Sequence, residues 1–219
     1  MRYRYNEVNL HTHSYYCRHG KGEIVDYVNV AKAKGLLKVL GFSEHAPLPD
    51  RTLDYGTRMA YSELDDYERD VKRADGRGGI KVLLGAECDW IEDEAGYYRD
   101  ELLGERGYSY LLGSVHSMVS PVTGLDTYIS RIGIAFRPML PEYVRKYTKM
   151  LSSGLFLYGC HPDLYMADYR MWDENAKAAA KDIGECAKDC GVPLEMNDNG
   201  LRKCLIDTEE GKRHPYTNK

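Results

Sequence analysis

The sequence contains no hydrophobic run long enough to cross a membrane, and its start, MRYRYNEVNL, mixes charged and aromatic side chains, unlike a signal peptide. Basic residues are not in excess, since 30 Lys and Arg stand against 34 Asp and Glu and leave a net charge of -4. No basic stripe of the kind that binds nucleic acid is present. These absences predict a soluble cytoplasmic protein with no nucleic-acid partner and no membrane association. A small anionic substrate would have to be held locally, by a metal ion or an arginine.

Two sequence motifs with a defined chemistry are also missing, the nucleophile motif of serine hydrolases and the CxxC pair of metal and redox sites. No GxSxG motif occurs, and the six cysteines include no CxxC pair. Cys17 has no general base that the sequence identifies, so it is either a soft metal ligand or, like most buried free cysteines, a packing residue. Catalysis by a serine or cysteine nucleophile is therefore not indicated, and reduced cysteines suit the cytoplasm. The 219 residues are enough for a single domain, 1–219, with its own core.

The sequence does contain a cluster of histidines near its start. The stretch VNLHTHSYYCRH places His11 and His13 directly after a short apolar run, and His19 follows. If residues 8–10 form a buried strand, side chains alternate along it, so His11 and His13 share a face and converge on one cation. Neutral imidazoles suit Zn, Fe or Mn. On this stretch alone, two surface histidines are an equally good interpretation.

Strands and helices are expected to alternate along most of the chain. Alternating βα units predict a parallel sheet, either closed as a barrel or open and doubly wound. Residues 117–140 lack a clear period and are expected to form a long excursion that shapes a binding pocket. The predicted strands are 8–10, 36–42, 80–86, 108–115, 155–160 and 193–196, and the predicted helices are 23–34, one opened by Ser62 and Asp65 as a capping box, 98–103, 141–152 and 173–190.

Candidate metal ligands follow five of these strands at their carboxyl ends. A single buried histidine is usually a satisfied core residue, but six at equivalent positions favour a multinuclear metal site. A barrel brings the carboxyl ends of all its strands to one mouth, whereas an open sheet offers mainly one crevice, so the pattern favours a TIM-like barrel. The residues are His11, His13, His19, His45, His116 and His161, with Glu87 at the corresponding position after the third strand.

Six short segments form an ordered series that is far more specific than any one of them. They are HTHSYYCRH at 11–19, GFSEHAPL at 41–48, GAECDW at 85–90, GSVHSM at 113–118, GCHPDL at 159–164 and EMNDNGLRK at 195–203. The series spans nearly the whole chain. It resembles the PHP (polymerase and histidinol phosphatase) superfamily and, within it, the histidinol-phosphate phosphatases.

The resemblance implies a distorted TIM-like (β/α)7 barrel that holds up to three divalent metal ions, which would be Zn, Mn or Fe. Glu44 precedes one of the implied ligands and is a candidate for contacting and orienting the metal ligands, although a capping or solvent-facing role fits that residue equally well. The implied ligands are His11 and His13 with Glu87 for one ion, His19 and His45 for a second, and Glu87 as a bridge to a third held by His116 and His161.

The resemblance further implies hydrolysis of L-histidinol phosphate to L-histidinol and phosphate in histidine biosynthesis. The ligand set suits this chemistry, because clustered divalent ions activate water and neutralise charge on the phosphoryl oxygens. With Glu87 at the reacting centre, Arg202 and Arg18 are candidates for binding the phosphate, unless they are ordinary surface cations. The alternatives are a PHP phosphoesterase that acts on nucleotides or nucleic-acid ends, and an inactive metal-binding remnant.

The sequence departs from the family pattern near its C-terminal end. Members of the family carry a further strand with an Asp-x-His pair that supplies two metal ligands, whereas this sequence runs through CLIDTEEGKRHPYTNK. His214 in that stretch resembles the segment that leads into the missing helix. We therefore expect the last helix and strand of the barrel to be missing. Truncation is favoured over a natural short form, because an unpaired strand edge is a liability for aggregation.

Overall fold

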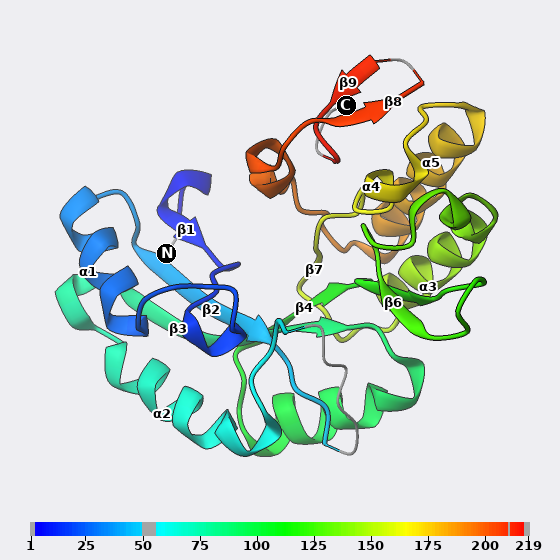
Figure 1. The fold of residues 1–219 in the computed structure, drawn as a ribbon. Coiled ribbons are helices and arrows are strands. Elements are labelled where there is room, and N and C mark those ends of the chain that lie inside the picture. Colours follow the sequence, from blue (N-terminus) through cyan, green and yellow to red (C-terminus); the bar gives the residue numbers. More distant parts are fainter. Residues whose placement is uncertain (1–2, 50–55, 210, 217–219) are drawn as a thin grey trace. The chain divides into compact units, whose positions relative to one another are not determined.

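The computed structural model describes residues 3–49, 56–209 and 211–216 (Figure 1). The chain folds as two compact units, Met1–Leu112 and Gly113–Lys219, which we call unit 1 and unit 2. No helix within the described residues is both long enough and apolar enough to cross a membrane.

The sheet of unit 1 is built from parallel strands that follow one another along the chain. Strand β1 (Val8–Asn9) pairs with β2 (Val39–His45), and β2 pairs with β3 (Lys81–Asp89). Strands β2 and β3 are buried over most of their length, as their apolar sequences predict, whereas β1 is at best half-buried, contrary to the prediction for 8–10. The register sets His45 directly opposite Glu87, so two candidate ligands lie on adjacent strands.

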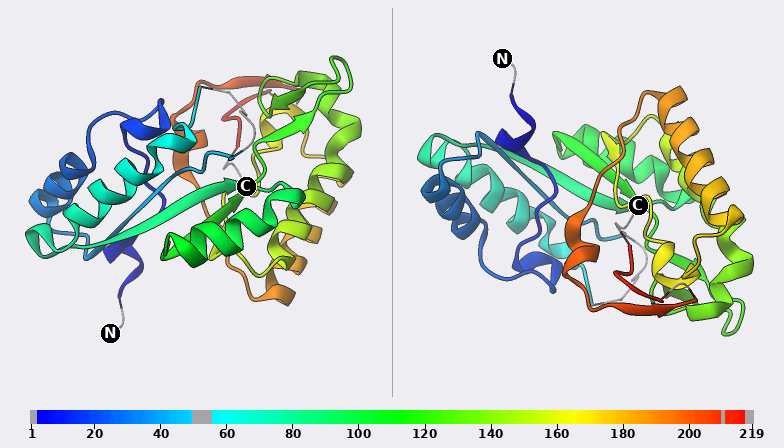
Figure 2. Two further views of the ribbon diagram at one scale, coloured as in Figure 1. Left: turned by 90° about the horizontal axis from the view of Figure 1, so that it is seen from below. Right: turned by 90° about the horizontal axis from the view of Figure 1, so that it is seen from above.

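Helices α1 (Ile24–Lys34) and α2 (Leu64–Ala74) lie along the outside of this sheet (Figures 1 and 2). The first helix agrees with the prediction for 23–34. It ends at Gly35, whose φ of 65° is the left-handed conformation that glycine adopts without steric cost. The helix predicted at 98–103 is a longer π-helical segment, η6 (Tyr97–Glu105).

The start of α2 differs from the prediction of a capping box formed by Ser62 and Asp65. The chain enters the helix through a 3-10 turn, η3 (Tyr61–Glu63). The Glu63 carboxylate accepts the backbone N–H of Ala60 at 2.7 Å, so this side chain caps the 3-10 turn, while α2 itself begins without a side-chain cap.

Tyr110 crosses the sheet of unit 1 above two glycines. Its hydroxyl donates to the carbonyl oxygens of Leu10 at 2.7 Å and Phe42 at 3.2 Å. A Cβ added at Gly41 would lie 2.2 Å from the Tyr110 hydroxyl oxygen, and one at Gly85 would lie 2.3 Å from its ring. Glycine is therefore needed at both positions to leave room for the aromatic ring, which ties the chain just before the first histidines to the sheet.

We expect Gly85→Ala to lower the free energy of unfolding by about 1–3 kcal/mol, because the new methyl group overpacks against the buried Tyr110 ring. Urea denaturation measures this difference. Gly184→Ala is the matched control. Gly184 lies in a helix with no heavy atom near its added Cβ, so alanine there should leave stability unchanged or raise it by up to about 1 kcal/mol. Equal losses in the two variants would contradict this explanation.

Strand β4 (Tyr110–Ser114) runs through the boundary between the two units. Near its start, the N–H of Ser109 donates to the Leu84 carbonyl at 2.8 Å, and near its end the Gly113 carbonyl accepts the N–H of Cys160 at 2.7 Å. The order of strands in the sheet is β1-β2-β3-β4-β7, where β7 is Tyr158–Gly159. The described residues thus form an α/β fold with a five-stranded sheet, fewer than the seven strands of the expected barrel.

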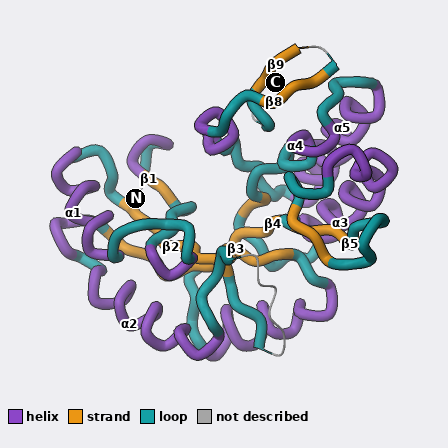
Figure 3. Tube along the Cα trace, viewed as in Figure 1, coloured by secondary structure: helices purple, strands orange, loops and turns teal. Residues whose placement is uncertain are grey.

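The helices of unit 2 agree closely with their predicted positions. Helix α3 begins one residue before the predicted Pro141, and α5 begins after Asp173, whose side chain accepts the N–H of Ala176 at 2.9 Å. Helices α3 and α5 pack side by side (Figures 2 and 3). The helices are α3 (Leu140–Ser152), α4 (Met166–Tyr169) and α5 (Glu174–Cys190), with η7 (Gly133–Met139) and η8 (Asp198–Arg202) as 3-10 segments.

The strands of unit 2 differ more from the predictions. The stretch 117–140 was expected to be irregular, but it contains an antiparallel hairpin of β5 (Ser117–Val119) and β6 (Asp126–Tyr128). The strand predicted at 155–160 is shortened to β7, and the one predicted at 193–196 makes a single parallel bridge between Gly159 and Leu194. A second hairpin joins β8 (Ile206–Thr208) to β9 (Gly211–Arg213).

Candidate metal centre

The histidine loop of unit 1 is anchored by a buried carboxylate. Oε1 of Glu44, a residue with no exposed surface, accepts both the backbone N–H and the hydroxyl of Ser14 at 2.6 Å. Asn9 accepts the N–H of His11 through its side-chain oxygen at 3.1 Å. These hydrogen bonds fix the backbone at His11 and at Ser14, on either side of His13. They therefore restrict the positions from which the imidazoles of His11 and His13 extend.

Three donor atoms converge in unit 1. The Nε2 atoms of His11 and His13 lie 3.0 Å apart, and Oε2 of Glu87 lies 3.2 Å from the first and 3.3 Å from the second. Ligand bonds of about 2.0–2.2 Å separate neighbouring donor atoms by about 3.0–3.5 Å in octahedral or tetrahedral coordination. The three atoms therefore fit one metal ion without rearrangement.

Glu87 also reaches a third imidazole. Its Oε2 lies 3.3 Å from Nδ1 of His45, which the register of β2 and β3 places opposite. The carboxylate is 1 % exposed, so its negative charge is compensated by groups of the protein or by a cation and not by water. A carboxylate shared by three imidazoles suits a ligand that contacts more than one ion.

A second donor set lies beside the first and includes Cys17. The ligand atoms of His13, Cys17 and His19 are close enough to hold an ion together, with Cys17 Sγ 3.9 Å from His19 Nε2. The rings of His19 and His45, which the family resemblance implies as ligands of a second ion, have centroids 5.3 Å apart. Cys17 also ties the loop, because its thiol donates to the Ser14 carbonyl at 3.0 Å.

The charges in this cluster favour a bound cation. Burial alone would lower the pKa of His13, but hydrogen bonds with Cys17, Glu44 and Glu87 raise that pKa well above its ordinary value. Burial would likewise raise the pKa of the Cys17 thiol, yet its hydrogen bonds with His13 and His19 outweigh this and lower the pKa to about 7. The carboxylates around His13 thus favour a positive charge at the imidazole, and the histidines around Cys17 favour the thiolate, which is the form that binds a metal ion.

Unit 2 brings its two predicted ligands together. The Nε2 atoms of His116 and His161 lie 3.1 Å apart, and both side chains are buried. Nδ1 of His116 forms a hydrogen bond of 3.0 Å with the Ser114 hydroxyl, which fixes the orientation of the ring and leaves Nε2 for a metal ion. The separation of the two Nε2 atoms again matches that of two ligands on one ion.

Glu195 is a further functional candidate that the sequence analysis did not single out. Its Oε2 accepts the backbone N–H of His161 at 3.1 Å and the side-chain amide of Asn197 at 2.9 Å. The sequence held a signal for it, because Glu195 belongs to the short predicted strand 193–196 just as Glu87 stands at the end of the third strand. The apolar run there is only a few residues long, which hid this equivalence.

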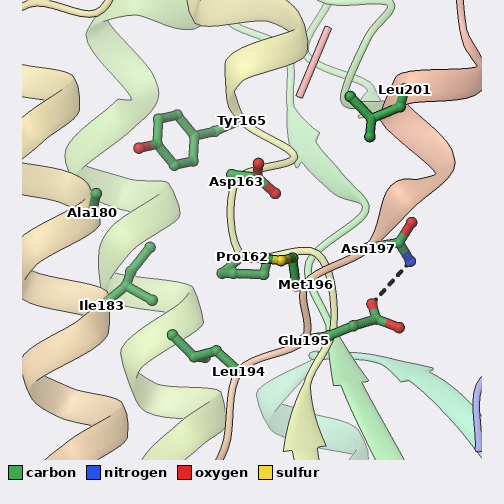
Figure 4. A pocket seen from close by; sticks show the side chains of 10 residues that line it. All are labelled: Pro162, Asp163, Tyr165, Ala180, Ile183, Leu194, Glu195, Met196, Asn197 and Leu201. Carbon is green, nitrogen blue, oxygen red and sulfur yellow. Dashed lines mark hydrogen bonds between the residues drawn. The ribbon is translucent and has the colours of Figure 1, made fainter. Parts of the chain in front are cut away.

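A pocket of about 490 Å³ lies next to the His161 segment in unit 2 (Figure 4). Ile183 and Leu194 give it an apolar side, while Asp163 and Glu195 contribute carboxylates. Pockets of a few hundred Å³ with an apolar wall and a few polar groups are typical of small-molecule sites. The pocket can therefore hold a small organic molecule, and its carboxylates favour a positively charged one.

The two arginines suggested by the sequence contact carboxylates. Arg18 follows the first histidines and pairs with Glu63, and Arg202 pairs with Asp198 four residues earlier at 2.9 Å. Both guanidinium groups are well exposed to solvent. Exposed pairs of this kind contribute little stability, so either arginine can exchange its partner for another anion.

Comparisons with known proteins identify relatives of the chain. A search of known sequences finds a probable histidinol-phosphatase of Schizosaccharomyces pombe, 27 % identical over 159 residues, which covers 68 % of this chain and 48 % of that protein. It also finds a histidinol-phosphatase of Bacillus subtilis, 32 % identical over 100 residues, which covers 41 % of this chain and 37 % of that protein. The chain thus matches less than half the length of each of these relatives.

Two solved structures share the fold. A candidate histidinol phosphatase of Listeria monocytogenes superposes with a TM-score of 0.72 at 17 % identity, covering 89 % of this chain and 83 % of that one. Histidinol phosphate phosphatase of Lactococcus lactis, in complex with Zn, L-histidinol and phosphate, gives a TM-score of 0.67 at 15 % identity, covering 90 % and 75 %. The family model of the PHP domain matches residues 9–199, most of the sequence. The chain belongs to the PHP domain family.

Proposed function

We propose that this chain provides the metal-dependent active site of a phosphoric monoester hydrolase whose substrate is L-histidinol phosphate. The observation that carries the proposal is the convergence of His11, His13 and Glu87 on one point, in a chain that belongs to the PHP domain family. The names of the two sequence relatives and the ligands of the Lactococcus lactis structure support the choice of substrate. The reaction would release L-histidinol and phosphate in histidine biosynthesis. The proposed location is the cytoplasm, which the lack of CxxC pairs and of a dense cysteine framework in the sequence supports.

The proposed metal complement is up to three divalent ions of Zn, Mn or Fe. Such ions would activate a water molecule and neutralise the phosphoryl oxygens. In unit 1 the protein holds the HxH imidazoles in place through Ser14 and Glu44, and in unit 2 it orients His116 through Ser114. The proposed ligands are His11, His13, His19, His45 and Glu87 in unit 1, and His116 and His161 in unit 2.

Two further groups are proposed to bind the substrate. Arg18 and Arg202 are proposed to hold the phosphate, because a guanidinium in an exposed pair can take phosphate in place of a carboxylate. The pocket next to His161 is proposed to receive the organic part. The amine of L-histidinol is a cation at neutral pH, so the carboxylates of Asp163 and Glu195 complement it.

For the fold, the proposal is a single PHP domain with a (β/α)7 barrel. The family model runs without interruption through both compact units, which supports one domain. The similarity to two PHP phosphatase structures supports the barrel architecture.

The proposal is tested by purifying the chain with Zn, Mn or Fe in turn and measuring phosphate release from L-histidinol phosphate, phenyl phosphate and nucleoside monophosphates. We expect kcat/KM for L-histidinol phosphate to exceed that for the other esters by at least about 10-fold, roughly 1.4 kcal/mol of selectivity. A preference for nucleotides would replace the substrate assignment. Tight metal binding without turnover of any ester would show a metal-binding remnant instead of an enzyme.

A further inference from the structure

Two cysteines on α5 form a cluster outside the proposed metal centre. Sγ of Cys186 lies 3.9 Å from Sγ of Cys190, one helical turn later. The hydroxyl of Ser152, the last residue of α3, lies 3.6 Å from the first sulfur and 3.5 Å from the second. Cys186 is partly exposed and Cys190 is exposed, so both sulfurs can be reached from solvent. This is a pair of neighbouring thiols held at one place by two packed helices.

We propose that Cys186 and Cys190 form a reversible dithiol–disulfide site on the surface of unit 2, which small-molecule disulfides such as oxidised glutathione oxidise. The proposal is independent of the phosphatase function. Among the described cysteines, Cys17, Cys88 and Cys160 are buried, and Cys204 is the other exposed one.

The two cysteines differ in how readily they react. Burial raises the pKa of the Cys186 thiol, and that thiol also donates to the Thr148 carbonyl at 3.6 Å. Cys190 is more exposed and is the last residue of α5. The attacking group is therefore the Cys190 thiolate, because exchange depends on access to the attacking sulfur.

The reaction balances in two exchange steps. The Cys190 thiolate attacks one sulfur of oxidised glutathione, which forms a mixed disulfide and releases one glutathione thiolate. Cys186 then loses its proton to solvent and attacks Sγ of Cys190, so the second glutathione thiolate leaves. The two thiols lose two electrons and two protons in all, and the two released glutathione molecules carry them.

The position of the pair makes the disulfide feasible but easy to reverse. Residues four apart on a helix have Cβ atoms about 5–6 Å apart, whereas a disulfide requires about 3.8 Å. The last turn of α5 must therefore open for the bond to form. That turn is the end of the helix, since Gly191 follows it in the left-handed conformation, so opening it disturbs no further turn of α5.

The test uses the full reduced chain and oxidised glutathione, with alkylation of the remaining thiols before the protein is unfolded. Lys188 lies between the two cysteines, so trypsin separates them onto different peptides unless a disulfide links them. In protein taken from the monomer band of a non-reducing gel, we expect the two peptides to be linked and to separate on treatment with dithiothreitol. Glutathione that stays on Cys190 while Cys186 is alkylated would overturn the proposal.

Two variants sharpen this test. In Cys186→Ser the resolving thiol is absent, so the glutathione adduct on Cys190 should accumulate at least about 10-fold above its level in the wild type. Cys204→Ser is the matched control, since it removes the other exposed thiol and should leave the linked peptides unchanged. Loss of the linked peptides in Cys204→Ser, or no increase of the adduct in Cys186→Ser, would contradict the assignment.

Discussion

Replacing Glu87 by glutamine should remove most of the bound metal and reduce kcat/KM for phosphate release by about 1000-fold or more. One oxygen of this carboxylate lies 3.2–3.3 Å from nitrogen atoms of His11, His13 and His45. An amide of the same shape keeps an acceptor but loses the negative charge that compensates cations in a buried site. Loss of a few kcal/mol of charge stabilisation in the transition state corresponds to a reduction of this size.

Elemental analysis of the purified variant and phosphate-release kinetics measure the two effects separately. Glu105→Gln is the matched control, because Glu105 is an exposed glutamate in the same unit. That variant should retain wild-type metal content and activity. If Glu87→Gln kept its full metal content and activity, the carboxylate would not be a ligand, and the proposed centre in unit 1 would be wrong.

The part of the site that could be predicted from sequence follows from one property of parallel sheets. The carboxyl ends of parallel strands lie at the same edge of the sheet. A polar residue directly after one apolar strand is therefore placed near the polar residues that follow the neighbouring strands. His45 and Glu87 occupy paired positions of β2 and β3 for this reason. The same logic brings His116 to His161 in unit 2, whereas His11 and His13 lie close together because they are two residues apart just after β1.

The details that could not be predicted depend on contacts between segments distant in sequence. The hairpin within 117–140 has strands of three residues, too short to show alternation. The pairing of Arg18 with Glu63 joins a bend to a 3-10 turn 45 residues later, and no local pattern encodes it. The role of Gly85 is visible only once Tyr110 is known to lie over it.

The predicted cap at the start of α2 was wrong for a related reason. Ser62 and Asp65 have the spacing of a capping box. In the structure, however, the Glu63 carboxylate accepts the backbone N–H of Ala60, and a 3-10 turn precedes the helix. A sequence motif indicates which residues are able to cap a helix. Which of them forms the capping hydrogen bond depends on the backbone conformation of the preceding loop.

Replacing His13 by alanine should impair the centre more than replacing His19, although both belong to the same loop. Nε2 of His13 lies 3.0 Å from that of His11 and 3.3 Å from Oε2 of Glu87, and its Nδ1 lies 3.7 Å from Oε2 of Glu44. His13 is also part of the donor set with Cys17 and His19. Its loss therefore weakens both sets and leaves two buried carboxylates less well compensated.

His19 is exposed and contributes to one of these sets only. We expect kcat/KM to fall by about 1000-fold in His13→Ala and by about 10- to 100-fold in His19→Ala, which correspond to roughly 4 kcal/mol and 1.4–2.7 kcal/mol. The metal content should be lower in His13→Ala than in His19→Ala. His214→Ala is the control, because His214 directly follows β9 and its Nδ1 lies 3.2 Å from the Lys203 carbonyl oxygen, and this variant should lose neither metal nor activity. A larger loss in His19→Ala than in His13→Ala would mean that the exposed end of the loop, and not its buried junction, holds the ion on which hydrolysis depends.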